Sequence, residues 1–341
     1  MKQDIKSMLF EELAAYFAET GERSFRAEQV FRWLHGGARS FAGMTDLPEK
    51  LREKLDSEFY ITSPELIIKR VSRIDGTIKY LWGMRDGAAV ESVTMEYSHG
   101  NTVCISSQVG CRMGCVFCAS SIGGLVRDLA ASEMLDQVMY SRLDSRKDLS
   151  NVVLMGIGEP LDNFDNVVRF LRLINHPLGM NIGARHISVS TCGIAEKIDK
   201  LAHCDIQFTL SASLHAPDDE TRSRLMPINR DGDVDRLLDA CARYFAETGR
   251  RVSYEYAMVD GVNDTLRHAG ILARKLRNTG SHVNLIPLSD VPERALRGSK
   301  PEQVSAFCGY LRENGVNCTV RRSLGGDISA SCGQLRRREL R

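Results

Sequence analysis

The sequence predicts an α/β protein built on a parallel sheet or barrel, preceded by a small α+β unit. Two observations support this: helical periodicity followed by hairpin patterns over the first hundred residues, then regular alternation of strand-like and helix-like segments. The chain has 341 residues and 43% hydrophobic residues, enough for a substantial core and about two domains. We place the boundary between an accessory domain, 1–97, and a main domain, 98–341.

The accessory unit combines helices with hairpins. Three segments show helical periodicity: 8–18, 26–36 and 47–58. The third is preceded by Thr45-Asp46-Leu47-Pro48, a cap followed by an early proline. Three strand-like runs follow, separated by Asp-Gly turn pairs: 65–71, 78–84 and 89–97. These antiparallel hairpins lead into an expected strand at 103–107.

The main domain alternates strands with helices. Strand candidates are 152–155, 186–190, 206–211, 252–258, 283–288 and 318–321. Helical stretches are 131–143, 234–247, 266–278 and 301–314. Ligands gather at the carboxyl ends of parallel strands, and unusual residues follow several of these strands. We therefore expect a binding site formed by segments 156–160, 190–193, 211–215 and 287–290.

Charge and composition exclude several classes of protein. The formal net charge is +1, so no global positive field attracts nucleic acid or a lipid surface. The chain has 34 Arg and 11 Lys, a bias that a GC-rich genome also produces. No apolar run reaches the length of a membrane span, and acidic residues interrupt the first apolar segment, unlike a signal peptide. We expect a cytoplasmic protein without membrane contact.

The ten cysteines all lie at or after residue 104, and three are clustered as Cys111-Arg-Met-Gly-Cys115-Val-Phe-Cys118. In a reducing compartment such a cluster indicates a metal site or redox chemistry. Three thiolates that hold a four-iron cluster leave one iron open to another ligand. The alternative is zinc with Cys104 as a fourth ligand, although structural zinc favours paired Cys-x-x-Cys units. Cys192, Cys204, Cys241, Cys308 and Cys318 are expected to be core thiols.

The three-cysteine motif, with Phe117 before its last cysteine and the βα repeat behind it, resembles the radical S-adenosylmethionine (SAM) superfamily. Further strings extend the resemblance to the RlmN/Cfr family of radical SAM adenine methyltransferases. They are Cys104-Ile-Ser-Ser-Gln-Val-Gly-Cys111, Met155-Gly-Ile-Gly-Glu-Pro160, Ser213-Leu-His-Ala216, Met226-Pro-Ile-Asn229, Asn284-Leu-Ile-Pro287 and Asp327-Ile-Ser-Ala-Ser-Cys332-Gly-Gln-Leu335. The segments 25–34 and 44–48 resemble the family's amino-terminal domain.

The resemblance implies a partial (β/α)6 radical SAM barrel with one [4Fe-4S] cluster per chain, held by Cys111, Cys115 and Cys118. It also implies two SAM molecules per turnover. One methylates Cys332, and the other yields a 5′-deoxyadenosyl radical that activates this methyl group for addition to adenine. Cys104 then forms a transient disulfide with Cys332 that releases the product. The resemblance suggests Glu91 as the acceptor of the adenine proton, with Cys104 as the alternative.

The implied SAM contacts are Gly158, Glu159, Ser190, Ser213, Leu214, His215 and Ser289. Glu159 would accept from the SAM ammonium. Ser289 stands where the family usually has asparagine, so its reach is shorter. His215 would contact SAM without transferring a proton.

The implied substrate is an adenosine in the peptidyl-transferase region of 23S rRNA and adenosine 37 in the anticodon loop of some tRNAs. Pro160 resembles the branch that methylates carbon 2; the alternative is the antibiotic-resistance branch, which methylates carbon 8. An alternative of another class is a non-catalytic, metal-stapled RNA-binding protein. An electron donor such as flavodoxin or ferredoxin is expected, as is a monomer. RNA contacts are expected from Arg23, Arg26, Arg32 and the tail, Arg336–Arg338 and Arg341, although these arginines could equally be solvated helix faces.

Overall fold

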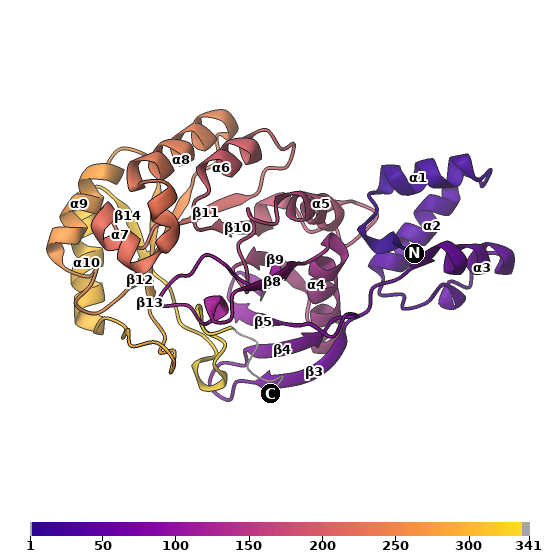
Figure 1. Cartoon of the computed structure of the whole chain (residues 1–341), viewed down its shortest axis with the longest axis horizontal. Coiled ribbons are helices and arrows are strands. Elements are labelled where there is room, and N and C mark those ends of the chain that lie inside the picture. Colours follow the sequence, from indigo (N-terminus) through magenta and orange to yellow (C-terminus); the bar gives the residue numbers. More distant parts are fainter. Residues whose placement is uncertain (1, 336–341) are drawn as a thin grey trace.

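The computed structural model describes residues 2–335, so the basic tail lies outside the described residues. The amino-terminal lobe contains the expected helices α1 (Phe10–Glu19), α2 (Phe25–His35) and α3 (Glu49–Glu58). A short parallel pair, β1 (Gln3–Asp4) and β2 (Phe59–Tyr60), closes the lobe. Each helix turns apolar residues inward, which confirms the helical periodicity. Figure 1 shows this lobe to one side of the larger sheet.

A buried ion pair attaches this lobe to the main domain. The Lys6 ammonium donates to Asp136 Oδ1 at 2.6 Å and to the Thr62 carbonyl at 2.5 Å. Both charged side chains are almost fully buried, and burial raises the pKa of Asp136 to about 6. The pair therefore joins the segment before α1 to α4 (Ala131–Ser145), the first helix of the main domain.

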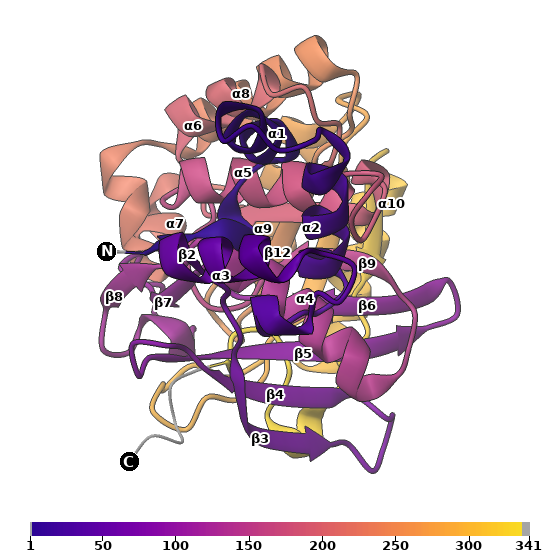
Figure 2. The ribbon, with the colours of Figure 1, turned by 90° about the vertical axis from the view of Figure 1, so that its right-hand side faces the viewer.

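A ten-stranded sheet forms the centre of the molecule, in the order β14-β13-β12-β11-β10-β9-β6-β5-β4-β3. The parallel strands are β6 (Gly100–Cys104), β9 (Leu149–Leu154), β10 (Ile187–Thr191), β11 (Thr209–Ser213), β12 (Ser253–Met258), β13 (His282–Pro287) and β14 (Asn317–Val320). The antiparallel strands are β3 (Glu65–Val71), β4 (Ile78–Gly83) and β5 (Ala89–Tyr97). Figure 2 shows these antiparallel strands stacked below β6. The expected boundary at 97/98 therefore lies within this continuous sheet, between β5 and β6, and the division there stays a prediction.

Helices connect successive parallel strands and lie along the outside of the curved sheet (Figure 1). Besides α4 they are α5 (Phe164–Asn175), α6 (Ala195–Ala202), α7 (Asp219–Leu225), α8 (Val234–Thr248), α9 (Leu266–Leu276) and α10 (Pro301–Glu313). This strand–helix order confirms the predicted α/β class and the partial barrel. Two strands differ in position. The expected strand 103–107 forms as β6 and ends at Cys104. The expected strand 206–211 begins at Thr209, because backbone turns occupy Cys204 to Phe208.

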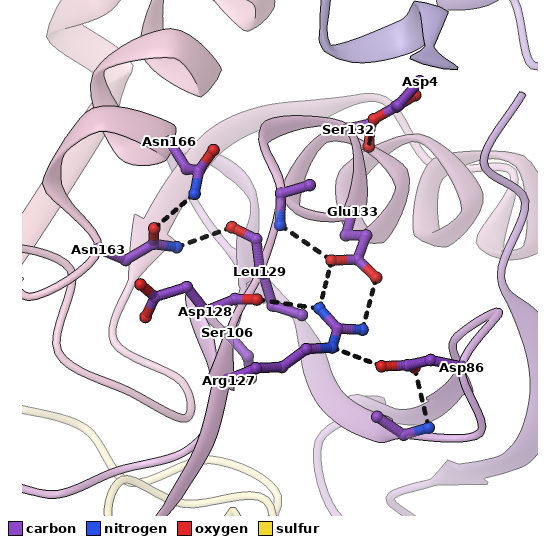
Figure 3. A network of polar contacts seen from close by, with 12 residues as sticks. Asp4, Asp86, Ser106, Arg127, Asp128, Leu129, Ser132, Glu133, Asn163 and Asn166 are labelled. Atoms are coloured by element: carbon purple, nitrogen blue, oxygen red, sulfur yellow. Dashed lines mark hydrogen bonds and ion pairs between the residues drawn. The ribbon is translucent and has the colours of Figure 1, made fainter. Parts of the chain in front are cut away.

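A polar network fixes the ribbon that flanks the clustered cysteines, formed by β7 (Gln108–Gly110) and β8 (Leu125–Asp128). Arg127 in β8 donates to both carboxylate oxygens of Glu133, each at 2.8 Å, and also pairs with Asp86 in the β4–β5 turn. Glu133 in turn accepts from the Ala130 N–H at the start of α4. Figure 3 shows Arg127 between these two carboxylates. The ribbon is thus tied to both a hairpin and a helix terminus.

Candidate active site

A cavity of about 880 Å³ opens at the carboxyl ends of the parallel strands, where the sequence predicted a binding site. The predicted site residues that line it are Cys111, Cys115, Cys118, Gly158, Glu159, Ser190, Ser213, His215 and Cys332. These residues come from separate segments between residues 111 and 332. The fold therefore brings together most of the set that the sequence assigned to one site.

The clustered cysteines lie on one wall of this cavity, in the loop between β7 and β8. Gly114 has a φ of +73°, a turn conformation that glycine adopts without strain. The Val116 N–H donates to the Leu225 carbonyl, and the Ala119 N–H donates to the Gly333 carbonyl. The loop is thus held to the end of α7 (Asp219–Leu225) and to the carboxyl-terminal segment next to Cys332.

Three thiols on one wall are a donor set of the kind that holds an iron–sulfur cluster. Burial raises the pKa of Cys111 to about 12 and that of Cys115 still further, so neither free thiol ionises readily. Among residues 2–335, no three His, Cys, Asp or Glu side chains converge as ligands of one metal ion. A four-iron cluster does not require such convergence, because each cysteine binds a different iron. The residues therefore fit the cluster.

Glu159 is a buried carboxylate at the end of the loop after β9. Its two oxygens accept backbone N–H groups, Oε1 from Leu161 at 2.9 Å and Oε2 from Cys192 at 2.7 Å. Burial raises its pKa, while these hydrogen bonds act in the opposite direction. The carboxylate is held rigidly on the cavity wall, with lone pairs left to accept from a cationic ligand.

Gly158 and His215 are both held in fixed positions on the cavity wall. Gly158 has a φ of +107°, and a Cβ there would lie 2.7 Å from the Gln108 backbone nitrogen. His215 accepts the Ala257 N–H on Nδ1 at 2.9 Å, so a neutral ring carries its proton on Nε2. Burial lowers the pKa of His215 to about 3. It is therefore a neutral hydrogen-bond donor, consistent with contact to a ligand without proton transfer.

The loop that carries Cys332 folds back over the cavity and is held on several sides. Lys79 Nζ donates to the Ser329 carbonyl at 3.1 Å, and the Gly325 N–H donates to Asp75 at 2.8 Å. On the other side, Ser120 Oγ donates to the Leu335 carbonyl at 2.8 Å. Cys332 is half-buried and lines the same cavity as the clustered cysteines.

A second and narrower cavity adjoins the first, and Cys104 is among its lining residues. Cys332, Met155, Ile286 and Arg321 line both cavities. Cys104 ends β6, and burial together with the nearby Cys332 sulfur raises its pKa to about 12. Cys104 and Cys332, which are predicted to form a disulfide, therefore line the same second cavity, and their pairing stays a prediction.

Three predicted residues occupy other positions. Glu91 is buried in β5 and forms an ion pair with Lys79 at 2.6 Å, and neither cavity includes it among its lining residues. Leu214 packs in the hydrophobic core and contributes its backbone groups to neighbouring loops. Ser289 lines the second cavity, beside Cys104 and Cys332. Their assigned roles stay predictions.

Sequence reasoning missed several buried polar residues. Arg321 and Glu255 line the first cavity, and Cys192, expected in the core, lines it as well. Glu255 is a carboxylate in the middle of the strand Ser253–Met258, and a charged residue in a strand of this kind is the sequence signal that could have identified it. Arg222 lies behind the wall and donates to the carbonyls of Cys192, Ser213 and Leu214 and to Asn229 Oδ1. It holds together two strand-end loops that carry predicted SAM contacts.

Comparisons with known proteins agree with this arrangement. A sequence model of the radical SAM superfamily matches residues 105–269, and one of the ribosomal RNA large subunit methyltransferase N-terminal domain matches residues 3–61. No helix in residues 2–335 combines the length and apolar character that a membrane span needs.

Relatives cover nearly the whole chain. The probable dual-specificity RNA methyltransferase RlmN of Lachnoclostridium phytofermentans is 49% identical, over 98% of this chain and 95% of the relative. That of Alkaliphilus metalliredigens is 46% identical, over 99% of this chain and 96% of the relative. The crystal structure of a radical SAM methyltransferase from Sphaerobacter thermophilus is 43% identical, with a TM-score of 0.93 over 98% of this chain and 99% of that one. The chain therefore belongs to the RlmN family of radical SAM RNA methyltransferases.

Proposed function

We propose that this enzyme methylates carbon 2 of an adenosine in 23S rRNA, and of adenosine 37 in some tRNAs, through S-methylated Cys332. The observation that carries the proposal is the position of Cys332 on the cavity that also contains Cys111, Cys115, Cys118 and Glu159. The relatives' names, which describe dual-specificity RNA methyltransferases, support two RNA substrates. Pro160 after Glu159 supports carbon 2 over carbon 8.

In the first half-reaction, the Cys332 thiolate attacks the methyl carbon of one SAM molecule, and S-adenosylhomocysteine leaves. A bond forms between Cys332 Sγ and the methyl carbon, and the bond from that carbon to the SAM sulfonium breaks. Glu159 would accept from the SAM ammonium, and neutral His215 would donate from Nε2. Ser190 and Ser213 are hydroxyl donors on adjacent strand ends of the same cavity.

Cys111, Cys115 and Cys118 would hold the [4Fe-4S] cluster, which supplies the electron that cleaves a second SAM to methionine and a 5′-deoxyadenosyl radical. Adenine carbon 2 is electron-poor and does not attack SAM directly, so carbon–carbon bond formation needs the activated methyl group on Cys332. The 5′-deoxyadenosyl radical would take a hydrogen atom from the S-methyl group and become 5′-deoxyadenosine, and the resulting carbon radical would add to carbon 2. A base then removes the carbon 2 proton, and the adduct loses one electron to the oxidised form of the electron-donor protein, which leaves a closed-shell thioether between Cys332 and the base. Glu91 and Cys104 remain the two candidates, and Cys104 is the one that lies on a cavity shared with Cys332.

Release of the methylated base uses the second thiol. Cys104 Sγ attacks Cys332 Sγ, a disulfide forms, and the Cys332 sulfur–carbon bond breaks. The electron pair of that bond stays on the carbon, which takes up a proton and becomes the methyl group. A thiol reductant then restores both thiols. The adjoining cavities on either side of Cys332 support this sequence.

The target base must leave its stack to reach this cavity. Arg23 and Arg32 are exposed on the amino-terminal lobe, and Arg32 forms an ion pair with Glu28 at 2.8 Å. Such an exposed pair exchanges readily for a phosphate contact, because its own contribution to stability is small. We propose that this lobe contacts RNA and that a flavodoxin or ferredoxin donates electrons to a cytoplasmic, monomeric enzyme.

The test is anaerobic incubation of iron-reconstituted protein with SAM, a reductant and either protein-free 23S rRNA or tRNA, followed by mass spectrometry of the nucleosides. We expect 2-methyladenosine. An 8-methyladenosine product would overturn the carbon 2 assignment, and 5′-deoxyadenosine without any methylated adenosine would overturn the substrate. The absence of both from cluster-loaded protein would favour the non-catalytic RNA-binding alternative.

A matched pair of cysteine variants tests the role of Cys332. Cys332→Ala removes the methyl acceptor, so we expect no methylated adenosine. Cys204→Ala serves as the control, because Cys204 is half-buried, as Cys332 is, and lies on neither of the two cavities. Equal product from the two variants would contradict the S-methylcysteine route.

A further inference from the structure

Arg321 is a largely buried arginine that the predicted mechanism does not use. It follows β14 directly, and its side chain is 17% exposed. It lines both cavities, on the wall where Cys332 also borders both. A permanently charged guanidinium at this junction needs anionic neighbours, because burying an uncompensated charge is costly.

The neighbours of Arg321 offer only partial compensation. Nη1 donates to Met155 Sδ at 3.2 Å, a weak acceptor, and lies 3.9 Å from Glu255 Oε2. Glu255 Oε2 also accepts from Asn284 Nδ2 at 2.8 Å, so this oxygen is shared. The Glu255 carboxylate therefore faces the guanidinium without the bidentate geometry that would saturate its donors.

Besides Glu255, the titratable groups that face Arg321 are the sulfurs of Cys332 and Cys104 and the phenol of Tyr97. The pKa of Arg321 is raised above its ordinary value, chiefly by the nearby Cys332 sulfur, with Glu255, Tyr97 and Cys104 adding to the effect. Burial raises the pKa of both Tyr97 and Cys104, so these two groups stay neutral near pH 7. Cys332 is half-buried, so its sulfur is the neighbour best placed to carry a negative charge that pairs with Arg321.

We propose that Arg321 is the positioning residue that holds the Cys332 sulfur as a thiolate for methyl transfer from SAM. This inference rests on the proposed role of Cys332 as methyl acceptor. The thiol proton leaves to solvent, because an arginine that is already protonated cannot accept it. The sulfur lone pair then forms the new bond to the methyl carbon, and the sulfonium takes the electrons of the bond that breaks. After transfer the sulfur is neutral, and Glu255 remains as the counter-ion of Arg321.

The test measures the reactivity of Cys332 with iodoacetamide as a function of pH, in the full-length protein. The tryptic peptide 323–336 contains Cys332 as its single cysteine, so mass spectrometry follows this residue alone and counts only its unmethylated form. We expect Arg321→Met to slow alkylation at pH 7.5 at least about tenfold and to move the midpoint of the pH profile up by about one unit. Arg321→Lys keeps a positive charge and should restore most of the rate.

A second variant separates electrostatics from folding. Glu255→Gln removes the competing carboxylate, so we expect faster alkylation of Cys332 and a lower pH midpoint, opposite in direction to Arg321→Met. General damage to the site would instead change both variants in the same direction. Arg243→Met, on an exposed ion pair of α8, is the control and should match the parent protein. Unchanged pH midpoints in both Arg321→Met and Glu255→Gln would overturn the proposal. Because alkylation needs neither SAM nor RNA, failure of the proposed methyltransferase activity would be seen separately, as normal alkylation without 2-methyladenosine.

Discussion

The ion pair between Lys79 and Glu91 should stabilise the protein and also hold the loop that carries Cys332. Lys79 Nζ lies 2.6 Å from Glu91 Oε1 and donates to the Ser329 carbonyl at 3.1 Å. The two side chains are 10% and 2% exposed, so solvent screens their interaction little. The variant Lys79→Met removes the ammonium and leaves a negative charge in a buried strand. We therefore expect a large loss of stability.

The expected loss is about 3–5 kcal/mol in the free energy of unfolding, the cost of removing one partner of a buried pair. The double variant Lys79→Met/Glu91→Leu also removes the buried carboxylate, so we expect most of this stability to return. It should remain about 1–2 kcal/mol below the parent, because the Ser329 carbonyl still lacks its donor. Urea unfolding followed by tryptophan fluorescence measures both values, with buried Trp82 on the same strand as Lys79 as a reporter.

The same variants test the link to the Cys332 loop. S-methylation of Cys332 during incubation with SAM should fall in both variants, since both lose the hydrogen bond to Ser329. If the double variant were as unstable as Lys79→Met alone, the remaining Glu91 charge would not be the cause of the loss. If S-methylation were unchanged in both, the contact with Ser329 would have no part in positioning Cys332.

Three further outcomes follow from the structure. Gly158→Ala should weaken SAM binding at least about tenfold in equilibrium dialysis, because its positive φ costs about 1–2 kcal/mol and its Cβ would meet the Gln108 backbone; binding within twofold of the parent would refute this. Arg222→Met should weaken SAM binding by a similar factor, since it removes the donors that join the loops after β10 and β11, whereas exposed Arg243→Met should not. Burial lowers the pKa of His35 to about 3, so its contribution is complete above pH 6.5 and is lost as the pH falls; in urea unfolding between pH 7 and 5, His35→Phe should therefore lose about 2 kcal/mol less stability than the parent protein, and an equal loss in both would refute this.

The periodicity of the sequence predicted the elements well wherever local pattern and burial agree. The helices at α1–α3, α4 and α8–α10 and most parallel strands lie within a few residues of their expected positions. The strand near Phe208 was misplaced, because an apolar run does not reveal where a backbone turn ends and pairing begins. The pairing of β5 with β6 agrees with the prediction that the hairpins lead into the strand near residue 103, and the domain boundary between these two strands stays a prediction.

The sequence predicted most of the residues that the fold brings to one cavity, but not the buried residues that support them. Cys111, Glu159 and Cys332 are recognisable from short strings, and all three line one cavity. Arg321 and Arg222 carry no such signal, because a buried arginine is identified by the carbonyls, carboxylates or sulfurs around it, and these come from distant segments.

Both the parallel and the antiparallel parts of the structure contribute to the surroundings of Cys332. The loop after β9 supplies Glu159, and the loop between β7 and β8 supplies the clustered cysteines. On the antiparallel side, β4 supplies Lys79 and the turn before it supplies Asp75, and these two residues hold the returning loop. As the methyl acceptor that we propose, Cys332 would approach SAM in the first transfer and adenine in the second, so we expect it to lie where two spaces meet. Cys332 lines two adjoining cavities, one with the predicted SAM contacts and one with Cys104. The hairpin that extends the barrel sheet is therefore expected to matter for activity, because its contacts from Lys79 and Asp75 hold the segment after β14 at the cavity.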